Sequence, residues 1–562
     1  MAPRIYTSPV APVRIVATSV FSHLFAGDEH SVGGFPADSP AYVDADSGTT
    51  LTRAQTKQQA LSLAHALKHD PRIRARRGDV ALVFSHNSLS WPVVLFGSVA
   101  AGLRCTLANS AYTPKELAFQ YTDSGARLLF SSEEGLPTVF DMFALLGVPT
   151  AEARERIVVM EAALEWAGGP SVPRTAPAIG LKTLADLLDT PGTLDQEERF
   201  DGPDAHETVY LCYSSGTTGK PKGVETTHQN ITSVLEIVKD TFPTICLGTD
   251  KMLGILPFYH IYGAVKLVHF PWTRGVPVII QPRFDPDKFC ASIERYRVTI
   301  ALIVPPVLVV LARHPAVDKY DVSSLAALFS GAAPLGAALV EQVTARLQAR
   351  RNGKGGFAIL QGYGLTETSP TTHLLPLADA QRKVGSIGIL LPNLEARLLV
   401  DGEGDGEGDV EAEEGQAGEL WIRGPTIMKG YLNNPKATRD SITPDGWFKT
   451  GDIAVRDAEG YYAIVDRRKE LIKYKVGFVL CYLAFSCFMR SCVRALVDSA
   501  ARLEIVIDDG GAMGRRVCCL LGATRPNPAR VKTEEAKRAF AQEVRQWTQA
   551  RVARHKFLRG GA

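Results

Sequence analysis

The chain has 562 residues, of which 45% are hydrophobic and 22% charged, and its 62 Lys and Arg residues nearly balance its 60 Asp and Glu residues. This composition is typical of a globular protein with a sizeable core, so it excludes extensive disorder. The near-neutral charge also argues against a polybasic nucleic-acid binder and an acidic tail protein, and we expect no nucleic-acid partner.

The cysteines and the apolar runs define the expected compartment. The nine cysteines are odd in number and contain no two Cys-x-x-Cys pairs, so neither a disulfide framework nor a zinc site is expected. Residues 1–16 lack the apolar core of a secretory signal, and the runs 298–311 and 476–489 are too short to span a bilayer. The chain ends Arg-Gly-Gly-Ala rather than Ser-Lys-Leu. We therefore expect a cytoplasmic protein, or a peroxisomal one if the native C-terminus is missing.

Over the first 450 residues, short apolar runs alternate with segments of helical periodicity. Strands are expected, in chain order, at 80–84, 126–131, 208–212, 254–256, 276–280 and 325–329. Helices are expected at 52–68, 91–101 and 336–350. This alternation predicts an α/β fold, with a large N-terminal domain of parallel or mixed sheets flanked by helices.

Residues 401–416 are acidic and rich in glycine, and they separate two expected strands at 396–400 and 418–423. This composition predicts a flexible surface loop. A calcium site is an alternative, but the spacing of the acidic residues does not follow that of an EF-hand loop.

The clearest chemical signal is Tyr213-Ser-Ser-Gly-Thr-Thr-Gly-Lys-Pro-Lys-Gly-Val224, which directly follows an expected buried strand. Small residues let the backbone approach a ligand closely, and successive N–H groups and hydroxyls can surround an anion. The segment is not a Walker A loop, because Ser214 stands where that motif requires glycine. It predicts a phosphate site, and a flexible Gly/Ser/Thr turn is the alternative.

Five further motifs follow this loop in order, and together they resemble those of the adenylate-forming acyl-CoA synthetases, most of all the 4-coumarate–CoA ligases. The motifs are Leu256-Pro-Phe-Tyr-His-Ile-Tyr-Gly263, Ser330-Gly-Ala-Ala-Pro-Leu335, Gln361-Gly-Tyr-Gly-Leu-Thr-Glu-Thr368, Trp447-Phe-Lys-Thr-Gly-Asp452 and Asp466-Arg-Arg-Lys-Glu-Leu-Ile-Lys-Tyr-Lys475. The similarity extends over roughly residues 15 to 475. It implies two half-reactions: a carboxylic acid and ATP form an acyl-adenylate and pyrophosphate, and the thiol of coenzyme A then displaces AMP. It also implies Mg²⁺ as a cofactor.

The resemblance implies a role for each matching residue of the ATP site. The β- and γ-phosphates are held by Ser214, Ser215, Gly216, Thr217, Thr218 and Lys222. The adenine is bounded by Gln361, Gly362 and Tyr363, and the ribose hydroxyls are held by Asp452 and Arg467. The hydroxyl of Thr366 lies near the α-phosphate, and Glu367 binds Mg²⁺, a hard cation suited to oxygen ligands.

The acid pocket implied by the resemblance is built from His260, Tyr262, Gly331, Ala332, Gly362, Gly364 and Pro370. His260, Lys222, Thr366 and Glu367 are the expected catalytic residues, although a packed core histidine is the alternative for His260. Plant coumarate ligases commonly carry lysine before the Ser-Gly-Ala-Ala-Pro motif, and here that residue is Phe329. We therefore expect an apolar aryl or medium-chain acid with broad specificity.

The family pattern breaks inside the expected lid. The resemblance implies an N-terminal domain at 1–466 and a small α+β lid at 467–562, with the hinge at Lys469 and CoA-facing residues at Lys473, Lys475 and Arg283. From residue 476 the family's Gly-x-Pro-x-Glu-Leu-Glu pattern is replaced by an apolar, cysteine-rich stretch. A retained intron explains this break, and a divergent lid is the alternative. The family's terminal lysine segment is also unmatched.

Two main functions follow from this pattern. The first is an acid–CoA ligase whose activity is impaired by an aberrant lid. The second is a non-catalytic or weakly active relative that binds nucleotide and acid. A peptide-synthetase adenylation module is a minor third alternative, which the lack of a following carrier-domain motif disfavours. The sequence does not predict the oligomeric state.

Overall fold

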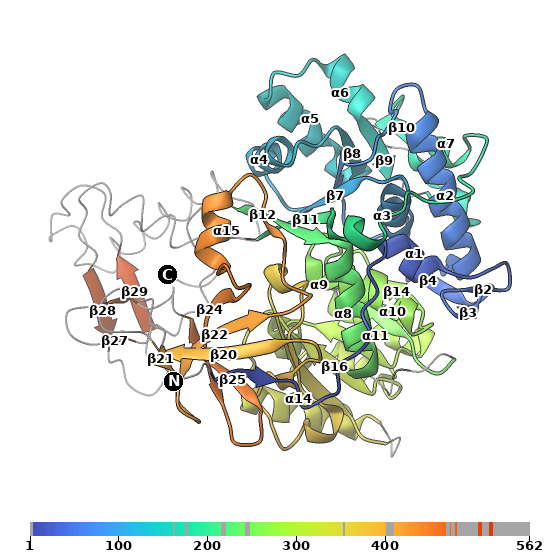
Figure 1. The fold of residues 1–562 in the computed structure, drawn as a ribbon. Helices are drawn as coiled ribbons and strands as arrows, with labels where there is room; N and C mark the ends of the chain where they lie inside the picture. The colour runs from blue at the N-terminus through green and yellow to red at the C-terminus, as the bar shows by residue number, and fades with distance from the viewer. Residues whose placement is uncertain are drawn as a thin grey trace, which may run out of the picture. The chain divides into compact units, whose positions relative to one another are not determined.

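The computed structural model describes residues 4–160, 163–173, 175, 178–214, 221–241, 245, 248–351, 355–400, 410–467, 472–473, 478–479, 504–508 and 516–520. The chain divides into two compact units. The larger unit comprises 1–110, 114–213 and 223–470, and the smaller comprises 111–113, 214–222 and 471–562. Figure 1 shows the ribbon, with labels on many of its helices and strands.

The first large sheet is mainly parallel. Its strands run in the order β10 (Lys182–Thr183), β9 (Ile157–Met160), β8 (Leu128–Ser132), β6 (Val80–Phe84), β7 (Arg104–Ala108), β11 (Thr208–Ser214), β12 (Lys222–Thr227) and β23 (Gly430–Tyr431). Neighbouring strands pair in parallel from β10 to β11. At the other end of the sheet, β12 pairs with β23 in the antiparallel sense. All five residues of β6 are buried, as expected of a central parallel strand.

The second large sheet has a parallel centre and antiparallel ends. Its order is β19 (Ile389–Leu390), β18 (His373–Leu374), β17 (Ala358–Tyr363), β16 (Ala327–Ser330), β15 (Ile300–Ile303), β13 (Met252–Gly254), β14 (Val278–Ile280), β4 (Pro40–Asp44) and β5 (Thr50–Thr52). The strands from β17 to β4 are parallel, so the carboxyl ends of β16 and β17 lie at the same edge.

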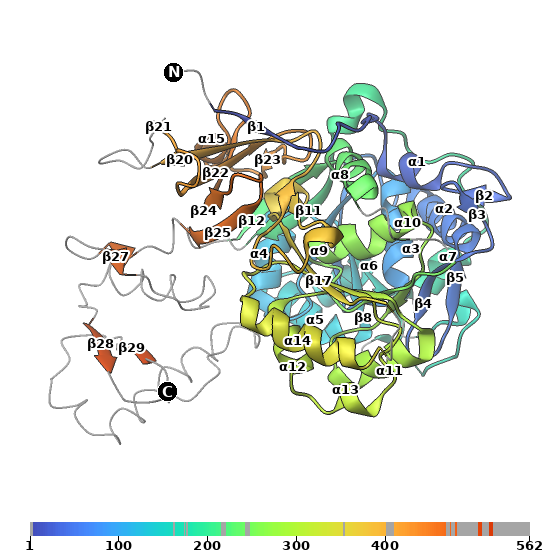
Figure 2. The ribbon, with the colours of Figure 1, turned by 90° about the horizontal axis from the view of Figure 1, so that it is seen from below.

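Side chains of the second sheet alternate between two apolar clusters. In β15, Ile300 and Leu302 belong to one cluster, whereas Ala301 and Ile303 belong to the other, as the two-residue period of a strand requires. The second cluster also contains residues of α11 (Pro286–Tyr296), α12 (Pro305–Leu311), α13 (Ala316–Lys319) and α14 (Ala337–Ala349). These helices therefore cover one face of the sheet, as Figure 2 shows.

The first cluster joins the two large sheets. It holds residues of β6, β7, β14 and β15 together with residues of α3 (Ser90–Ala100), α8 (His228–Thr241) and the π-helix η5 (Ala264–His269). Helices packed between two sheets must be apolar on every side, and every residue of α3 is buried. The second helix, α2 (Arg53–His69), begins with a capping box between Thr52 and Gln55 and packs on α3.

The remaining helices are α1 (Val20–Phe25), α4 (Pro114–Ser124), α5 (Leu136–Leu145), α6 (Thr150–Arg156), α7 (Leu184–Leu188), α9 (Ile261–Gly263), α10 (Phe270–Thr273) and α15 (Pro435–Ser441). Short 3₁₀ turns lie at 133–135, 165–167, 202–206, 366–368 and 377–379. Within the described part of the chain, no helix is both long and apolar enough to cross a membrane.

An antiparallel sheet completes the larger unit. Its order is β1 (Tyr6–Thr7), β20 (Glu395–Val400), β22 (Gly418–Arg423), β24 (Phe448–Arg456) and β25 (Tyr462–Arg467), and β21 (Val410–Glu411) also pairs with β20. A separate hairpin joins β2 (Ser31–Val32) to β3 (Phe35–Pro36). In the smaller unit, β26 (Ile472–Lys473) pairs with β27 (Phe478–Val479), and β28 (Glu504–Asp508) pairs with β29 (Arg516–Leu520).

The predicted α/β class is confirmed, and most expected strands are present with shifted ends. The strand expected at 254–256 is β13 at Met252–Gly254, since Leu256 already belongs to the loop before α9. Within the acidic loop expected at 401–416, residues 401–409 lie outside the described residues, and residues 410–411 form strand β21 rather than loop, because they pair with β20. Most of the expected lid also lies outside the described residues. The domain boundary between residues 466 and 467 stays a prediction.

Candidate functional site

The Ser/Thr/Gly loop joins β11 to β12. Ser214 ends β11 and Lys222 begins β12. The predicted phosphate ligands Ser215, Gly216, Thr217 and Thr218 lie outside the described residues. The flanks of the loop are fixed by packing around Tyr213, whose hydroxyl donates to Asp123 Oδ2 at 2.6 Å. A Cβ atom on Gly223 would lie 3.1 Å from the Tyr213 ring, so a small residue at 223 suits this packing.

The expected acid-pocket residues meet at the carboxyl end of β16. His260 caps α9, and its Nδ1 accepts a hydrogen bond from the Tyr262 backbone N–H at 3.2 Å. The Tyr262 hydroxyl donates to the Phe329 carbonyl at 3.3 Å. A Cβ atom on Gly331 would lie 3.2 Å from the Tyr262 ring. His260, Tyr262 and Gly331 are thus brought to one place, and their role as an acid pocket stays a prediction.

Gln361 and Tyr363 end β17, beside β16. The parallel register places Gln361 opposite Ser330, so the predicted adenine wall and acid pocket share one sheet edge. Gly362 pairs with Leu374, and Tyr363 with His373, on the antiparallel neighbour β18. The Tyr363 and His373 rings make an edge contact with centroids 5.8 Å apart, which helps to fix the tyrosine.

A tight turn after β17 carries Thr366 and Glu367. A Cβ atom on Gly364 would lie 1.7 Å from the Pro370 carbonyl oxygen, so no side chain fits there without movement. The backbone N–H of Leu365 donates to Thr368 Oγ1 at 2.9 Å. Thr366–Thr368 form a single 3₁₀ turn, which ends at Ser369 with φ of 64°. The turn holds Glu367 in one orientation.

Glu367 is 7% exposed and is held by a second element. The Tyr431 hydroxyl donates to Glu367 Oε1 at 2.9 Å, and the Met428 N–H donates to the Glu367 carbonyl at 2.9 Å. Burial raises the pKa of Tyr431, and the neighbouring Glu367 carboxylate raises it further. Tyr431 therefore stays a neutral donor that orients the carboxylate.

The predicted ribose ligands lie opposite each other on β24 and β25. Asp452 pairs with Arg467 in the antiparallel register. Asp452 is 6% exposed, and its Oδ2 accepts a hydrogen bond from the Tyr363 hydroxyl at 2.6 Å. This contact brings the predicted adenine and ribose residues together across 89 positions of sequence.

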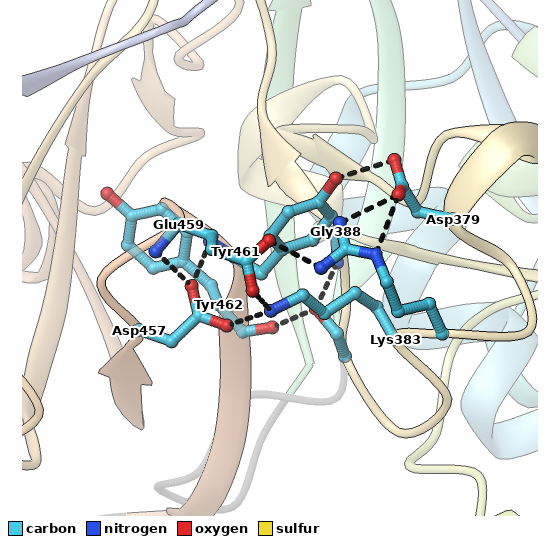
Figure 3. A network of polar contacts seen from close by, with 9 residues as sticks. Asp379, Lys383, Gly388, Asp457, Glu459, Tyr461 and Tyr462 are labelled. Carbon is cyan, nitrogen blue, oxygen red and sulfur yellow. Dashed lines mark hydrogen bonds and ion pairs between the residues drawn. The ribbon is translucent and has the colours of Figure 1, made fainter.

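A polar network fixes the start of β25 (Figure 3). Lys383 Nζ lies 2.6 Å from both Asp457 Oδ2 and Glu459 Oε1, and Tyr461 donates its hydroxyl to Asp379 Oδ2 at 2.6 Å. The pKa of Asp379 is lowered by that hydrogen bond and by Arg382. The backbones of Tyr462 and Gly388 form an isolated antiparallel β-bridge. The network ties the β24–β25 turn to residues 379–388, and so helps to hold the strand that carries Arg467.

The predicted CoA and hinge residues are described only in part. Arg283 is exposed and follows β14. The pKa of His86 is lowered by the burial of its own ring and, to a lesser extent, by the charge of Arg283. Lys473 lies on β26 opposite Phe478. Lys469 and Lys475 lie outside the described residues. Ala332, which follows Gly331, has a φ of 68°. Pro370 follows Ser369 through a cis peptide bond.

Sequence reasoning missed Lys266. It lies on η5, four positions after Tyr262, and its residue is 6% exposed. Burial lowers the pKa of Lys266 to about 7. The available signal was a single lysine inside the apolar run Ala264-Val-Lys-Leu-Val268, a pattern that is costly to bury.

The surroundings of Glu367 fit a magnesium ion. Mg²⁺ usually binds one or two carboxylates together with substrate phosphates and water. Glu367 supplies one oriented carboxylate. In the described ranges, no group of three or more His, Cys, Asp or Glu side chains is placed to hold a metal ion. The donor set therefore suits an ion shared with a nucleotide.

Comparison with known proteins gives consistent matches. Residues 28–432 match the family of AMP-binding enzymes. The chain is 35% identical over 438 residues to 4-coumarate–CoA ligase-like 4 of Oryza sativa subsp. japonica, and this alignment covers 77% of the chain and 73% of the relative.

Solved structures extend these matches. The inhibitor-bound N-terminal domain of FACL13 from Mycobacterium tuberculosis has a TM-score of 0.61 and 28% identity, covering 76% of this chain and 96% of that one. ATP-bound MatB from Rhodopseudomonas palustris has a TM-score of 0.69 and 22% identity, and the match covers 97% of this chain and 94% of MatB. At the latter identity the likeness concerns the fold alone.

Proposed function

The chain belongs to the AMP-binding enzyme family of adenylate-forming enzymes, and we propose that it activates a carboxylic acid with an aryl or medium-chain body and transfers it to coenzyme A. The family and the relatives support the activity of an ATP-dependent, AMP-forming acid–thiol ligase. The chemical class of the acid and the roles of the individual residues are the proposal.

The observation that carries the proposal is the 2.6 Å contact between Tyr363 and Asp452 beside the turn that holds Glu367. An aromatic ring next to a buried carboxylate suits a base and the hydroxyls of its ribose. A second, oriented carboxylate on the following turn suits the metal of a nucleotide triphosphate. These three side chains in one place match the needs of ATP better than those of an acyl chain alone.

In the proposed adenylation step, Tyr363 would stack on the adenine, and Asp452 and Arg467 would hold the ribose. Lys222, Ser214 and the loop residues would neutralise the β- and γ-phosphates, and Thr366 would donate to the α-phosphate. Mg²⁺ bound through Glu367 would offset charge on the phosphates. The carboxylate of the acid would approach beside His260. Such catalysis is mainly positioning and charge stabilisation.

The proposed acid body follows from the surroundings of Tyr262. Phe329 is 8% exposed, and its carbonyl oxygen accepts a hydrogen bond from the Tyr262 hydroxyl. Gly331 places no side chain against the hydroxyl end of the Tyr262 ring, where a Cβ atom would lie 3.2 Å away. An apolar wall with one glycine suits a flat ring or an extended alkyl chain.

We further propose that the lid limits turnover, because residues after Lys475 depart from the family pattern. We also keep the cytoplasm as the proposed compartment, since the described Cys105, Cys212 and Cys290 are free and buried. The competing function is the binding of ATP and an acid without turnover. The same departure of the lid from the family pattern favours this alternative.

The test is ATP–pyrophosphate exchange over a panel of aryl and alkyl acids, with thioester products identified by mass spectrometry. We expect exchange with several apolar-bodied acids, and Glu367→Gln to reduce it at least about 100-fold. Glu341→Gln, at an exposed position on α14, is the matched control and should leave exchange unchanged. ATP binding without exchange on any acid would favour the non-catalytic relative.

A further inference from the structure

Lys266 stands out among the buried cations of the larger unit. Arg53 is 1% exposed, yet its guanidinium donates to the Val32 carbonyl at 2.7 Å and the Trp272 carbonyl at 3.0 Å, and it stacks on the Trp272 ring. Arg351, 8% exposed, donates to the carbonyls of Ser323 and Leu325. Buried cations in this protein are therefore normally satisfied, as general energetics requires.

Lys266 Nζ, in contrast, has no hydrogen-bond partner among the residues that the structure describes. The centroid of the Phe270 ring lies 5.8 Å from Lys266 Nζ, at the outer limit of a cation–π contact. Leaving a buried donor unsatisfied is costly, and more so when the donor is charged. Such a residue suggests a partner that the protein itself does not supply.

The local backbone directs Lys266 toward the acid-pocket residues. Residues 264–269 form a π-helix, a geometry frequent at functional sites. Lys266 follows Tyr262 by four positions, so both side chains leave the same side of the helical segment. Tyr262 meets the carboxyl end of β16 through Phe329 and Gly331.

The neighbouring polar groups of this segment are already paired. His269 Nδ1 lies 2.9 Å from the Ala264 carbonyl, and its Nε2 lies 2.7 Å from the Tyr210 hydroxyl. The Val268 carbonyl accepts from the Tyr42 hydroxyl at 2.6 Å. The hydrogen bonds of this segment to β4 and β11 are thus made by Val268 and His269. The Lys266 ammonium takes no part in them, and we infer that it can bind a ligand on the side of Tyr262.

We propose that Lys266 is a specificity-determining residue that binds an oxygen acceptor, best a carboxylate, at the end of the acid remote from the reacting carboxylate. The inference rests on the proposed acid pocket. It adds to the apolar aryl or alkyl body a polar terminus several bonds away from the reacting carboxylate, because Lys266 lies six residues after His260 along the helical segment. The ammonium is compact and can meet one carboxylate with charge-assisted hydrogen bonds.

The experiment measures binding of matched acids to the full chain by calorimetry in the presence of a non-hydrolysable ATP analogue. Two pairs serve as probes: octanoic against octanedioic acid, and phenylpropanoic against para-carboxyphenylpropanoic acid. We expect the acid with the second carboxylate to bind at least about tenfold more tightly in each pair. Lys266→Met should remove or reverse this preference. Lys288→Met, at an exposed lysine paired with Asp46, should retain it.

The outcomes separate this inference from the proposed function. Equal or tighter binding of the two monocarboxylic acids by the unaltered chain overturns the inference, whether or not Lys266→Met folds. A preference that persists in Lys266→Met also overturns it. If the preference is present and depends on Lys266 but no acid supports pyrophosphate exchange, the specificity role stands and the proposed ligase activity fails.

Discussion

The hydrogen bond from Tyr431 to Glu367 predicts a residue-level effect on the metal. Replacing Tyr431 by Phe removes the 2.9 Å contact that orients Glu367 Oε1 and leaves the carboxylate itself in place. Partners that orient a metal ligand typically contribute about 10–100-fold in metal affinity or activity. We therefore expect Tyr431→Phe to raise the Mg²⁺ concentration for half-maximal exchange by about that factor.

Tyr296→Phe is the matched control, because Tyr296 also donates its hydroxyl over 2.9 Å, but to the Ala45 carbonyl on another part of the unit. Its Mg²⁺ dependence should equal that of the unaltered chain. A Tyr431→Phe protein with lower activity but an unchanged Mg²⁺ requirement would mean that Glu367 does not hold the metal.

Lys266 predicts a pH-dependent gain of stability on substitution. Burial lowers its pKa from 10.5 to about 7, so between these values the unfolded state binds more protons than the folded state. Stability therefore rises with pH across this window, and the lysine is most costly at and below pH 7. Lys266→Met removes the group, and we expect it to stabilise the protein by a few kcal/mol at pH 7. The gain should shrink toward pH 10.5.

Urea unfolding of both proteins at neutral and alkaline pH measures this difference. Lys288→Met, which removes an exposed lysine, should change stability little at either pH. If Lys266→Met is less stable than the unaltered chain at neutral pH, the ammonium has a stabilising partner in the free protein. A stability gain combined with lost selectivity would instead identify a functional residue retained at a cost.

At the scale of elements, the turn from Gly364 to Pro370 is the most constrained connection of the site. A Cβ atom at 364 would overlap the Pro370 carbonyl, so Gly364→Ala must displace the turn that carries Thr366 and Glu367. We expect a loss of several kcal/mol in transition-state stabilisation, or failure to fold. Gly356→Ala is the control, because nothing lies within 4 Å of a Cβ atom there.

Exchange activity and urea midpoints for the two glycine variants separate the possibilities. Gly356→Ala should match the unaltered chain in both. Gly364→Ala with normal exchange would show that the turn moves without consequence, and that the position of Glu367 is not critical.

Sequence patterns predicted elements better than they predicted contacts between elements. The apolar run Val80–Phe84 coincides with β6 because a short run of consecutive apolar residues is typical of a strand buried on both faces. Strand β13 begins two residues earlier than expected, because an apolar run does not mark where a strand ends and a loop begins. The hydrogen bond between Tyr363 and Asp452 was not predicted, since no local pattern links residues 89 positions apart; the family resemblance only assigned both residues to one nucleotide site. Lys266 was missed because a lone lysine ordinarily predicts exposure.

At the scale of the whole molecule, the residues proposed to hold adenine, ribose, metal and acid belong to the larger unit, as do the hinge candidate Lys469 and the CoA candidate Arg283. The phosphate-loop residues 214–222 and the CoA candidates Lys473 and Lys475 belong to the smaller unit. Within the stretch that departs from the family pattern, β28 and β29 form an antiparallel pair from Glu504 to Leu520. Whether this stretch is a retained intron stays a hypothesis, which sequencing of the mature transcript tests.

The division of roles between the units predicts how a lid replacement acts. Replacing the residues after Lys475 with the matching segment of a relative that keeps the Gly-x-Pro-x-Glu-Leu-Glu pattern leaves the larger unit unchanged. ATP and acid affinities should therefore change less than about twofold. Lid groups that act in the transition state should raise kcat by at least about tenfold, because interactions made only there alter kcat rather than ground-state binding. Calorimetric ATP binding and steady-state thioester formation, measured on both proteins, check the two parts independently. A replacement that tightens ATP binding while leaving kcat unchanged would place the defect in the larger unit. A replacement that changes neither quantity, with exchange still absent, would instead favour the non-catalytic relative.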